Sequence, residues 1–312
     1  MQKNLLKYIL KRLLLLIPVV LGITFIIFIV LNLAQGDPAV MILGQDATAE
    51  ALAAKRAELG LDKPLVVQYV NYILGVLRGN FGTSWLGGYE VLPEFLHRIP
   101  YTILLGSLSM FVACIIGIPL GIIAAIRQYH VVDYASLALA LILFSLPSFW
   151  FAMMGQILFC LVLNWLPASG VGSLAHFVLP SITLGANILA SQLRMTRTSM
   201  LDVVKQDYIR TARANGLPEG SVVYKHALKN ALIPVITIIG MQVRVVIGGS
   251  LLVEQLFNIP GLGTLLTTAL NNRDYMIVQN CTLLIALFTV AANLLVDIAY
   301  GFIDPRIRIT RR

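Results

Sequence analysis

The sequence has little charge. Only 12% of its 312 residues are Asp, Glu, Lys or Arg, whereas 58% are hydrophobic. Soluble globular domains average about 25% charged residues. Half that fraction, together with several long apolar runs, excludes an ordinary soluble domain and indicates a chain that crosses a membrane several times.

Paired cysteines and the common catalytic motifs are also missing. The sequence has no phosphate-binding lysine loop, no H-E-x-x-H and no G-x-S-x-G, so nothing indicates an enzyme acting on its own. The three cysteines sit in apolar runs without pair spacing, which argues against a disulfide or a metal site; they are Cys114, Cys160 and Cys281. The four histidines are far apart in sequence and form no expected metal or catalytic cluster; they are His97, His130, His176 and His226.

Six apolar segments are long enough to cross the hydrocarbon core, which takes about 20 helical residues. Because an isolated span must satisfy its backbone hydrogen bonds internally, all six are expected to be α-helices. The sequence therefore predicts an all-α polytopic membrane protein with spans near 9–33, 101–126, 134–163, 176–198, 231–256 and 280–302.

The first apolar run, 13–33, follows four basic residues and resembles a signal peptide. It is longer than the roughly 7–15 residues of a signal core, and no A-x-A site follows it, so an uncleaved first span is expected. With the N-terminus in the cytoplasm, 16 of the 23 Lys and Arg residues fall on the inner side, as the positive-inside rule requires. This distribution explains the net charge of +8 without nucleic acid and places both termini in the cytoplasm.

The expected organisation has four parts: the N-terminal segment and first span 1–33, an extracytoplasmic cap loop 34–100, a five-helix core 101–302 and a basic tail 303–312. The cap loop contains a predicted helix at 65–78, on which Gln68, Asn71, Gly75 and Arg78 form one narrow polar stripe. We expect this helix to lie against the membrane surface or the mouth of the helix bundle.

Several predicted spans contain proline or glycine, including Pro147, Pro180 and the run "GIPLG" at 117–121. These residues predict kinks and close helix packing, or helices shaped around a pathway. Charged residues within the spans are candidates for function. Arg244 and Glu254 are candidates for lining a pathway or for packing, whereas Asp297 is expected to pair with a basic cytoplasmic group.

A charged segment, 207–230, interrupts the apolar pattern; we call it the signature loop. It lies within the predicted cytoplasmic loop 199–230, and a helix that continues the fourth span leads into it. Gly216 is suited to end this helix, and Pro218 to begin a second one at 221–228. We expect that second helix to gather Val222, Val223, His226 and Ala227 on one side, before Pro234 begins the fifth span.

Three interpretations of the signature loop are a solvated basic loop, a DNA-binding helix-turn-helix and a docking element for a cytoplasmic partner. The membrane tether at both ends argues against DNA binding. The glycine-proline turn and the compact length indicate order and favour docking.

The stretch "DYIRTARANGLPEGSVVYKHALKNALIPV" resembles the E-A-A-x3-G…I-x-L-P loop of inner-membrane permease subunits of ABC importers. Gly216 and Ala212 take the glycine and second alanine positions. Arg210, Thr211, His226 and Lys229 depart from the general motif but fit the peptide and nickel branch of the family, and in particular its first (B-type) dipeptide and oligopeptide permeases. Other matching stretches are "KYILKRLLLLIP", "DPAV", "NFGTSW", "PGLG", "NRDYMIVQ" and "DPRIR".

The resemblance implies a permease of a bacterial or archaeal cytoplasmic membrane that pairs with a second, similar permease. Two cytoplasmic ATPase subunits would use the ATP and Mg²⁺, and an extracytoplasmic binding protein would deliver the solute; this chain would bind no cofactor. The expected solutes are di- or oligopeptides, with nickel, glutathione or a metal chelate as alternatives. A self-contained secondary transporter is the competing class. The residues expected to couple the chain to an ATPase are Arg210, Thr211, Ala212, Arg213, Ala214, Gly216, Leu217, Pro218, Tyr224 and His226.

Overall fold

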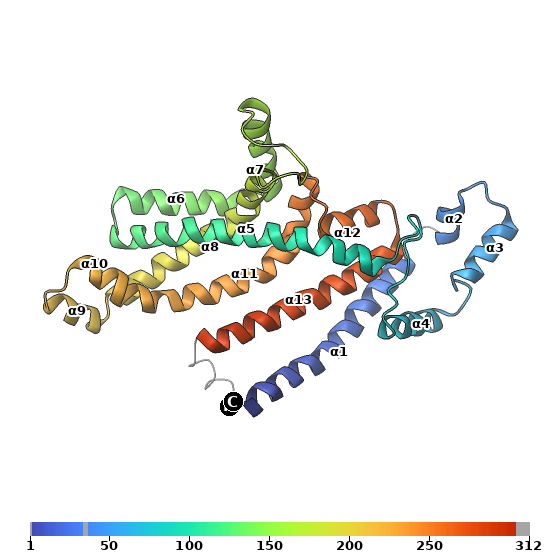
Figure 1. Ribbon diagram of the computed structural model, residues 1–312, viewed down its shortest axis with the longest axis horizontal. Helices are drawn as coiled ribbons and strands as arrows, with labels where there is room; N and C mark the ends of the chain where they lie inside the picture. Colours follow the sequence, from blue (N-terminus) through green and yellow to red (C-terminus); the bar gives the residue numbers. More distant parts are fainter. Residues whose placement is uncertain (1, 34–36, 304–312) are drawn as a thin grey trace. The chain divides into compact units, whose positions relative to one another are not determined.

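The computed structural model describes residues 2–33 and 37–303, without the side chains of residues 2–13, 16, 244, 245, 247, 249 and 297–303. In this part of the chain every regular secondary-structure element is a helix. β-Pairing is limited to one isolated bridge between Thr83 and Glu90. The predicted all-helical class is therefore confirmed. Figure 1 labels the helices, which are α1 (Gln2–Leu33), α2 (Pro38–Leu43), α3 (Ala49–Glu58), α4 (Leu65–Leu77), α5 (Val91–Ile126), α6 (Val131–Ser145), α7 (Ser148–Gly155), the π-helix η1 (Gln156–Val162), α8 (Ala175–Val204), α9 (Asp207–Ala214), α10 (Glu219–Ser221), the π-helix η2 (Val222–Ala227), α11 (Leu228–Leu256), α12 (Leu262–Asn271) and α13 (Tyr275–Ile303).

The chain forms two compact units. The first comprises residues 1–99 and 265–290, and the second comprises residues 100–264 and 291–312. Helices α5, α12 and α13 contribute to both units.

Three helical segments with described side chains are long and apolar enough to cross a membrane: Val91–Ile126, Glu219–Val243 and Tyr275–Val296. The first ends at the residue where the sequence predicts the end of the second span. In α1, residues 17–33 form a shorter apolar helix within the described side chains. Among the described residues, three of the six predicted spans therefore coincide with helices that meet this criterion, or four if the bent pair 131–145 and 148–162 is one span.

The predicted third span, 134–163, is broken. Helix α6 and the α7–η1 pair meet at an angle of 103°. Pro147 disfavours the helical conformation for the residue before it, and Leu146 is accordingly extended, with ψ at 128°. The kink expected at Pro147 is therefore a sharp bend, and the two halves do not form one straight rod.

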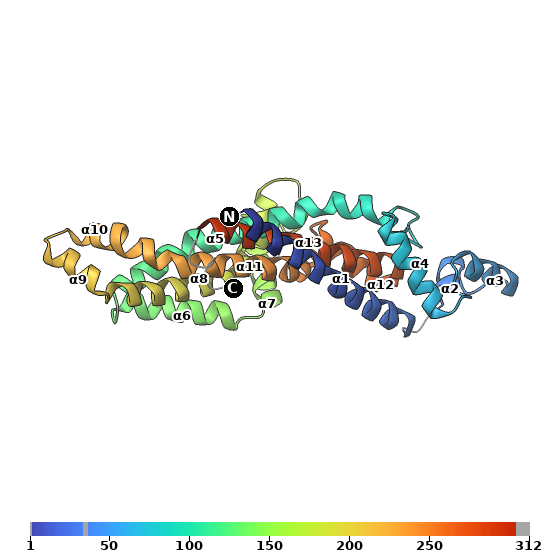
Figure 2. The same ribbon diagram turned by 90° about the horizontal axis from the view of Figure 1, so that it is seen from below.

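Helix α8 is the central helix of the second unit, where it lies beside α6 and α11 (Figures 1 and 2). It is buried along most of its length. Its contact with α5 depends on glycine. A Cβ at Gly121 would lie 2.7 Å from the Leu193 carbonyl oxygen, and one at Gly185 would lie 2.8 Å from that of Ser109. The small residues of "GIPLG" thus allow two backbones to touch, as the close-packing interpretation predicts.

In the first unit, Tyr69 holds α4 against α1. Its hydroxyl lies 3.0 Å from Thr24 Oγ1 and donates to the Leu21 carbonyl, while its ring packs on Phe25 and Phe28. The helix predicted at 65–78 is confirmed. Other apolar side chains of α4, among them Val66 and Leu77, are largely exposed. An amphipathic helix that exposes such a face is suited to lie at a membrane surface.

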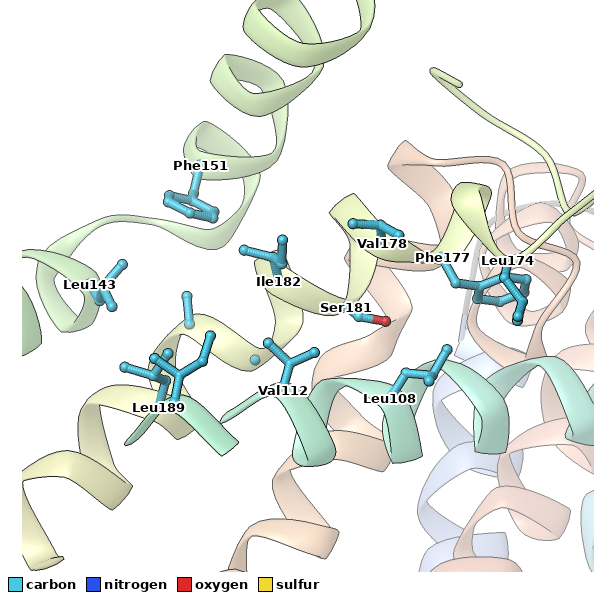
Figure 3. A pocket seen from close by; sticks show the side chains of 13 residues that line it. Leu108, Val112, Leu143, Phe151, Leu174, Phe177, Val178, Ser181, Ile182 and Leu189 are labelled. Carbon is cyan, nitrogen blue, oxygen red and sulfur yellow. The ribbon is translucent and has the colours of Figure 1, made fainter. Parts of the chain in front are cut away.

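A cavity of about 350 Å³ lies in the second unit beside the bend. Figure 3 shows Leu108 and Val112 of α5 facing Val178 and Ile182 of α8 across it, with Phe151 of α7 nearby. Its lining is almost wholly apolar, and the Ser181 hydroxyl is the oxygen visible among the labelled side chains.

Adding one methyl group at Gly121 should separate α5 from α8. We expect Gly121→Ala to lower the free energy of unfolding by about 1–3 kcal/mol, because the backbone of α8 cannot yield as a side chain does. Thermal unfolding of the purified protein in detergent measures the loss. The control is Gly22→Ala in α1, where a Cβ meets nothing within 4 Å; it should be neutral or slightly stabilising. Equal melting temperatures for the two variants would contradict this account.

Candidate functional site

The signature loop begins with helix α9, which ends in a glycine turn. Gly216 has φ at +75°, the left-handed conformation predicted for it. Its N–H donates to the Arg213 carbonyl at 2.9 Å, and the N–H of Leu217 donates to the Ala212 carbonyl at 3.4 Å. These two bonds form the Schellman arrangement, which satisfies the last carbonyls of a helix. The turn therefore has one defined conformation that depends on residue 216 having no side chain.

A salt bridge spans the turn. Arg213 donates to both carboxylate oxygens of Glu219, with Nε at 3.1 Å and Nη2 at 2.6 Å. This hydrogen bonding raises the pKa of Arg213 above its ordinary value. Pro218 is the residue just before α10, extended with ψ at 141°, and is not inside the first turn as predicted. The bidentate pair and the fixed proline both hold α9 and α10 at one separation.

One face of the signature loop is buried. Ile209 and Ala212 of α9 pack with Val222, Val223 and Ala227 of η2 in one apolar cluster, which also includes Met200 of α8 and Ile122 and Ala125 of α5. The loop is thus a packed extension of the second unit and not a solvated linker.

The opposite face carries exposed side chains of mixed character. Tyr208, Leu217 and Tyr224 are exposed apolar groups. Of the predicted coupling residues, Ala212 alone is buried; the exposed ones are Arg210, Thr211, Arg213, Ala214, Gly216, Leu217, Pro218, Tyr224 and His226. An exposed face that combines aromatic, apolar and basic groups on a rigid support has the composition of a protein–protein contact.

His226 is not on the buried side, so the prediction that grouped it with Val222, Val223 and Ala227 is wrong. The reason is the π-helical conformation of residues 222–227, whose hydrogen bonds join residues five apart. This wider turn places Ala227 between the two valines and rotates His226 outward. Sequence periodicity cannot detect it, because the prediction assumed about 3.6 residues per turn.

The second arm of the loop is not a separate short helix. Helical structure runs from α10 through η2 into α11 without a break, and Pro234 lies inside α11. The helix that contains the predicted fifth span therefore begins well before Pro234. The exposed arm and the long apolar helix form one continuous element.

Of the two charged candidates in the predicted fifth span, the structure describes the side chain of Glu254 only. Arg244 lies in α11, but its side chain is outside the described part of the structure. Glu254 is fully buried. Its carboxylate accepts hydrogen bonds from Thr102 Oγ1 and from the Gly263 N–H, both at 2.7 Å. Glu254 thus caps the start of α12, and its carboxylate is buried within the second unit.

The "PGLG" motif makes room for this carboxylate. A Cβ at Gly261 would lie 2.3 Å from Glu254 Oε2, and one at Gly263 would lie 2.5 Å from the Leu251 Cα. Residues 261 and 263 can therefore pass Glu254 only as glycines.

Two buried aspartates escaped the sequence-based prediction. Asp133 of α6 accepts from Arg197 of α8 at 2.5 and 2.8 Å. Asp274 accepts from the Ser84 hydroxyl at 2.6 Å and from the backbone N–H of Trp85 at 3.3 Å. The second contact joins the "NFGTSW" and "NRDYMIVQ" stretches. Partners so distant in sequence leave no local spacing signal.

Replacing Glu254 by leucine should destabilise the second unit. The substitution removes the carboxylate that accepts from Thr102 Oγ1 and from the N–H groups of Gly263 and Thr264, and the loss of a buried hydrogen-bonding group costs about 1–3 kcal/mol. Thermal unfolding and protease resistance at residues 257–261 measure the effect. Glu254→Gln keeps an acceptor oxygen and should lose less, and Gln255→Leu, at an exposed neighbour, should be nearly neutral. A stable Glu254→Leu protein with an intact loop would refute the capping role.

Comparisons with known proteins agree on one class. The model for "binding-protein-dependent transport system inner membrane component" matches residues 117–309, and its N-terminal companion matches residues 5–106. The glutathione transport system permease protein GsiC of Salmonella typhimurium is 44% identical over 97% of this chain and 99% of its own length. The dipeptide transport system permease protein DppB of Escherichia coli K12 is 40% identical with the same coverage.

Solved structures show the same fold at low identity. The MetNI methionine ABC transporter, in inward-facing form, gives a TM-score of 0.56 at 16% identity, over 68% of this chain and 96% of that one. An amino acid ABC transporter crystallised with histidines gives 0.53 at 12% identity, over 69% and 94%. The fold and the signature loop thus define the permease subunit of an ABC importer, a membrane transport component and not an enzyme. Within that class, the chain belongs to the family of binding-protein-dependent inner membrane components.

Proposed function

We propose that this permease pairs with a second permease to form the pathway for di- or oligopeptides. An extracytoplasmic binding protein delivers the peptide, and two separate ATPase subunits hydrolyse ATP in the cytoplasm. The chain then spans the membrane six times, with both termini in the cytoplasm; the inward excess of Lys and Arg supports this orientation.

The geometry of the signature loop supports its proposed role in coupling the ATPase subunits to the transmembrane helices. Its buried face fixes it to α5 and α8, the salt bridge braces its turn, and its other face is exposed. A partner that moves this face moves a rigid body. Because the second arm continues into α11, the displacement passes directly into a predicted span. A solvated loop would need none of these features.

The solute class rests on the relatives. One is named for dipeptides and the other for glutathione, itself a tripeptide, and both are similar to this chain over nearly its whole length. Uptake of short peptides is thus the proposal, with glutathione as the alternative that the higher identity favours. Nickel and metal chelates remain the other branch expected from the sequence.

Uptake by the assembled transporter tests the solute. In vesicles that contain both permeases, both ATPases and the binding protein, labelled dialanine should accumulate when ATP is supplied, and excess unlabelled dipeptides should compete. If glutathione competes and dipeptides do not, the solute is glutathione; if nickel competes and dipeptides do not, the solute is nickel.

Gly216→Val should uncouple transport from ATP hydrolysis. A β-branched side chain at φ of +75° costs about 1–2 kcal/mol and displaces the turn, so ATPase attachment weakens while the apolar helices still insert. Co-purification of the ATPases measures their attachment, and ATP-driven uptake measures coupled transport. The matched control is Gly220→Val in the same loop, where a Cβ meets open space and φ is not positive. Full uptake with normal ATPase attachment in Gly216→Val would rule out the coupling role.

A further inference from the structure

The first unit contains a cavity of about 520 Å³. We call it the amide-lined cavity. Its walls come from the end of α1, from residues 37–85 and from the first turns of α13, all within that unit. Aromatic and amide side chains characterise the lining; among them are Phe28, Tyr72, Phe81, Trp85, Gln279 and Asn280.

Three polar atoms in this lining are buried and make no hydrogen bond of standard geometry: Tyr72 Oη, Gln279 Nε2 and Asn280 Oδ1. The other end of Asn280 is already fixed, because its Nδ2 donates to the Met276 carbonyl at 3.0 Å. The free amide oxygen is thereby held as an acceptor, and Gln279 Nε2 can only donate. Burial raises the pKa of Tyr72, and its hydroxyl and the Gln279 amide face one another without forming a well-aligned hydrogen bond.

Buried polar atoms without partners are costly and rare in native proteins. One such atom is a packing defect. Three such atoms line one cavity, and they include both donors and an acceptor. This is the pattern expected of a binding site whose polar groups form their hydrogen bonds with a ligand.

The cavity is held by fixed contacts. Gln68 donates to the Lys63 carbonyl at 2.7 Å, and Arg56 Nε donates to Asp37 at 2.7 Å. On the side near α13, Asp274 fixes Ser84, and Gly82 lies so close that a Cβ there would sit 2.6 Å from Met276 Sδ. These contacts preorganise the walls, which lowers the entropic cost of binding.

The lining chemistry selects the ligand class. Among the described residues that line the cavity, only Asp37 and Arg56 are charged, and they neutralise one another. An anionic headgroup would require an unpaired cation, and a metal chelate would favour ionised or imidazole ligands. A peptide backbone instead presents neutral N–H and C=O groups, which the Asn280 oxygen and the Gln279 nitrogen match one for one, while aromatic walls accept small side chains.

We propose that the amide-lined cavity binds the backbone of a short cargo peptide, as a station on the permease in addition to the binding protein. The inference rests on the proposed peptide transport and names a site for it. It differs in kind from the cavity of Figure 3, whose almost wholly apolar lining offers no such pattern.

The test measures equilibrium binding of trialanine to the whole transporter in lipid nanodiscs, with both permeases and both ATPases but without the binding protein. The control ligand is 8-aminooctanoic acid, which has the same chain length and terminal charges but no amides. Gln279→Met removes the free donor at nearly constant shape. Gln192→Met removes another buried, unpartnered glutamine amide, in the second unit and outside the cavity, and is the matched control. Tyr72→Phe is a second variant of the cavity.

We expect trialanine to bind and 8-aminooctanoic acid not to. Gln279→Met and Tyr72→Phe should each weaken trialanine binding about tenfold, and Gln192→Met should leave it unchanged. Melting temperatures should not fall in the cavity variants, because an unsatisfied buried group has been removed.

Two outcomes would overturn the inference: unchanged trialanine affinity in both cavity variants, or equal binding of 8-aminooctanoic acid. Either of these with normal dialanine uptake leaves the proposed function standing. Loss of the proposed function would appear separately, as uptake of glutathione or nickel without competition by dipeptides.

Discussion

The direct approach of the α5 and α8 backbones is the constraint on which the second unit depends. Gly117, Gly121 and Gly185 remove the side chains that would keep the two helices apart. Without a hydrophobic driving force inside a bilayer, such contact is a principal source of helix association. Since α8 also packs on α6 and α11 and leads into α9, its position determines where the signature loop lies.

Buried carboxylates fasten the connecting segments in both units. Glu254 holds the start of α12, Asp274 holds the segment around Ser84, and Asp133 ties α6 to Arg197. Each accepts at least two hydrogen bonds, which offsets the cost of removing a polar carboxyl group from water. The matched stretches "NFGTSW", "PGLG" and "NRDYMIVQ" thus have a shared physical basis, since each supplies donors, space or the carboxylate itself.

Much of the helical framework was predictable because local signals determine it. The apolar length of 101–126, the helix at 65–78 and the glycine turn at 216 follow from hydrophobicity and backbone preference alone. Three other features could not be predicted from these local signals: the 103° bend at Pro147, the π-helix at 222–227 and the partners of Glu254. Proline marks a break without setting its angle. Contacts such as that of Thr102 with Glu254 arise only once the helices are packed.

The uninterrupted path from α10 into α11 has a mechanical consequence. Helix α11 alone has 29 residues and, at about 1.5 Å per residue, is roughly 43 Å long. A rod of that length acts as a lever: a tilt of about 5° at one end shifts the other by roughly 4 Å, more than the diameter of a water molecule. If the pivot lies close to the exposed arm, a small displacement of that arm produces a larger one at the far end.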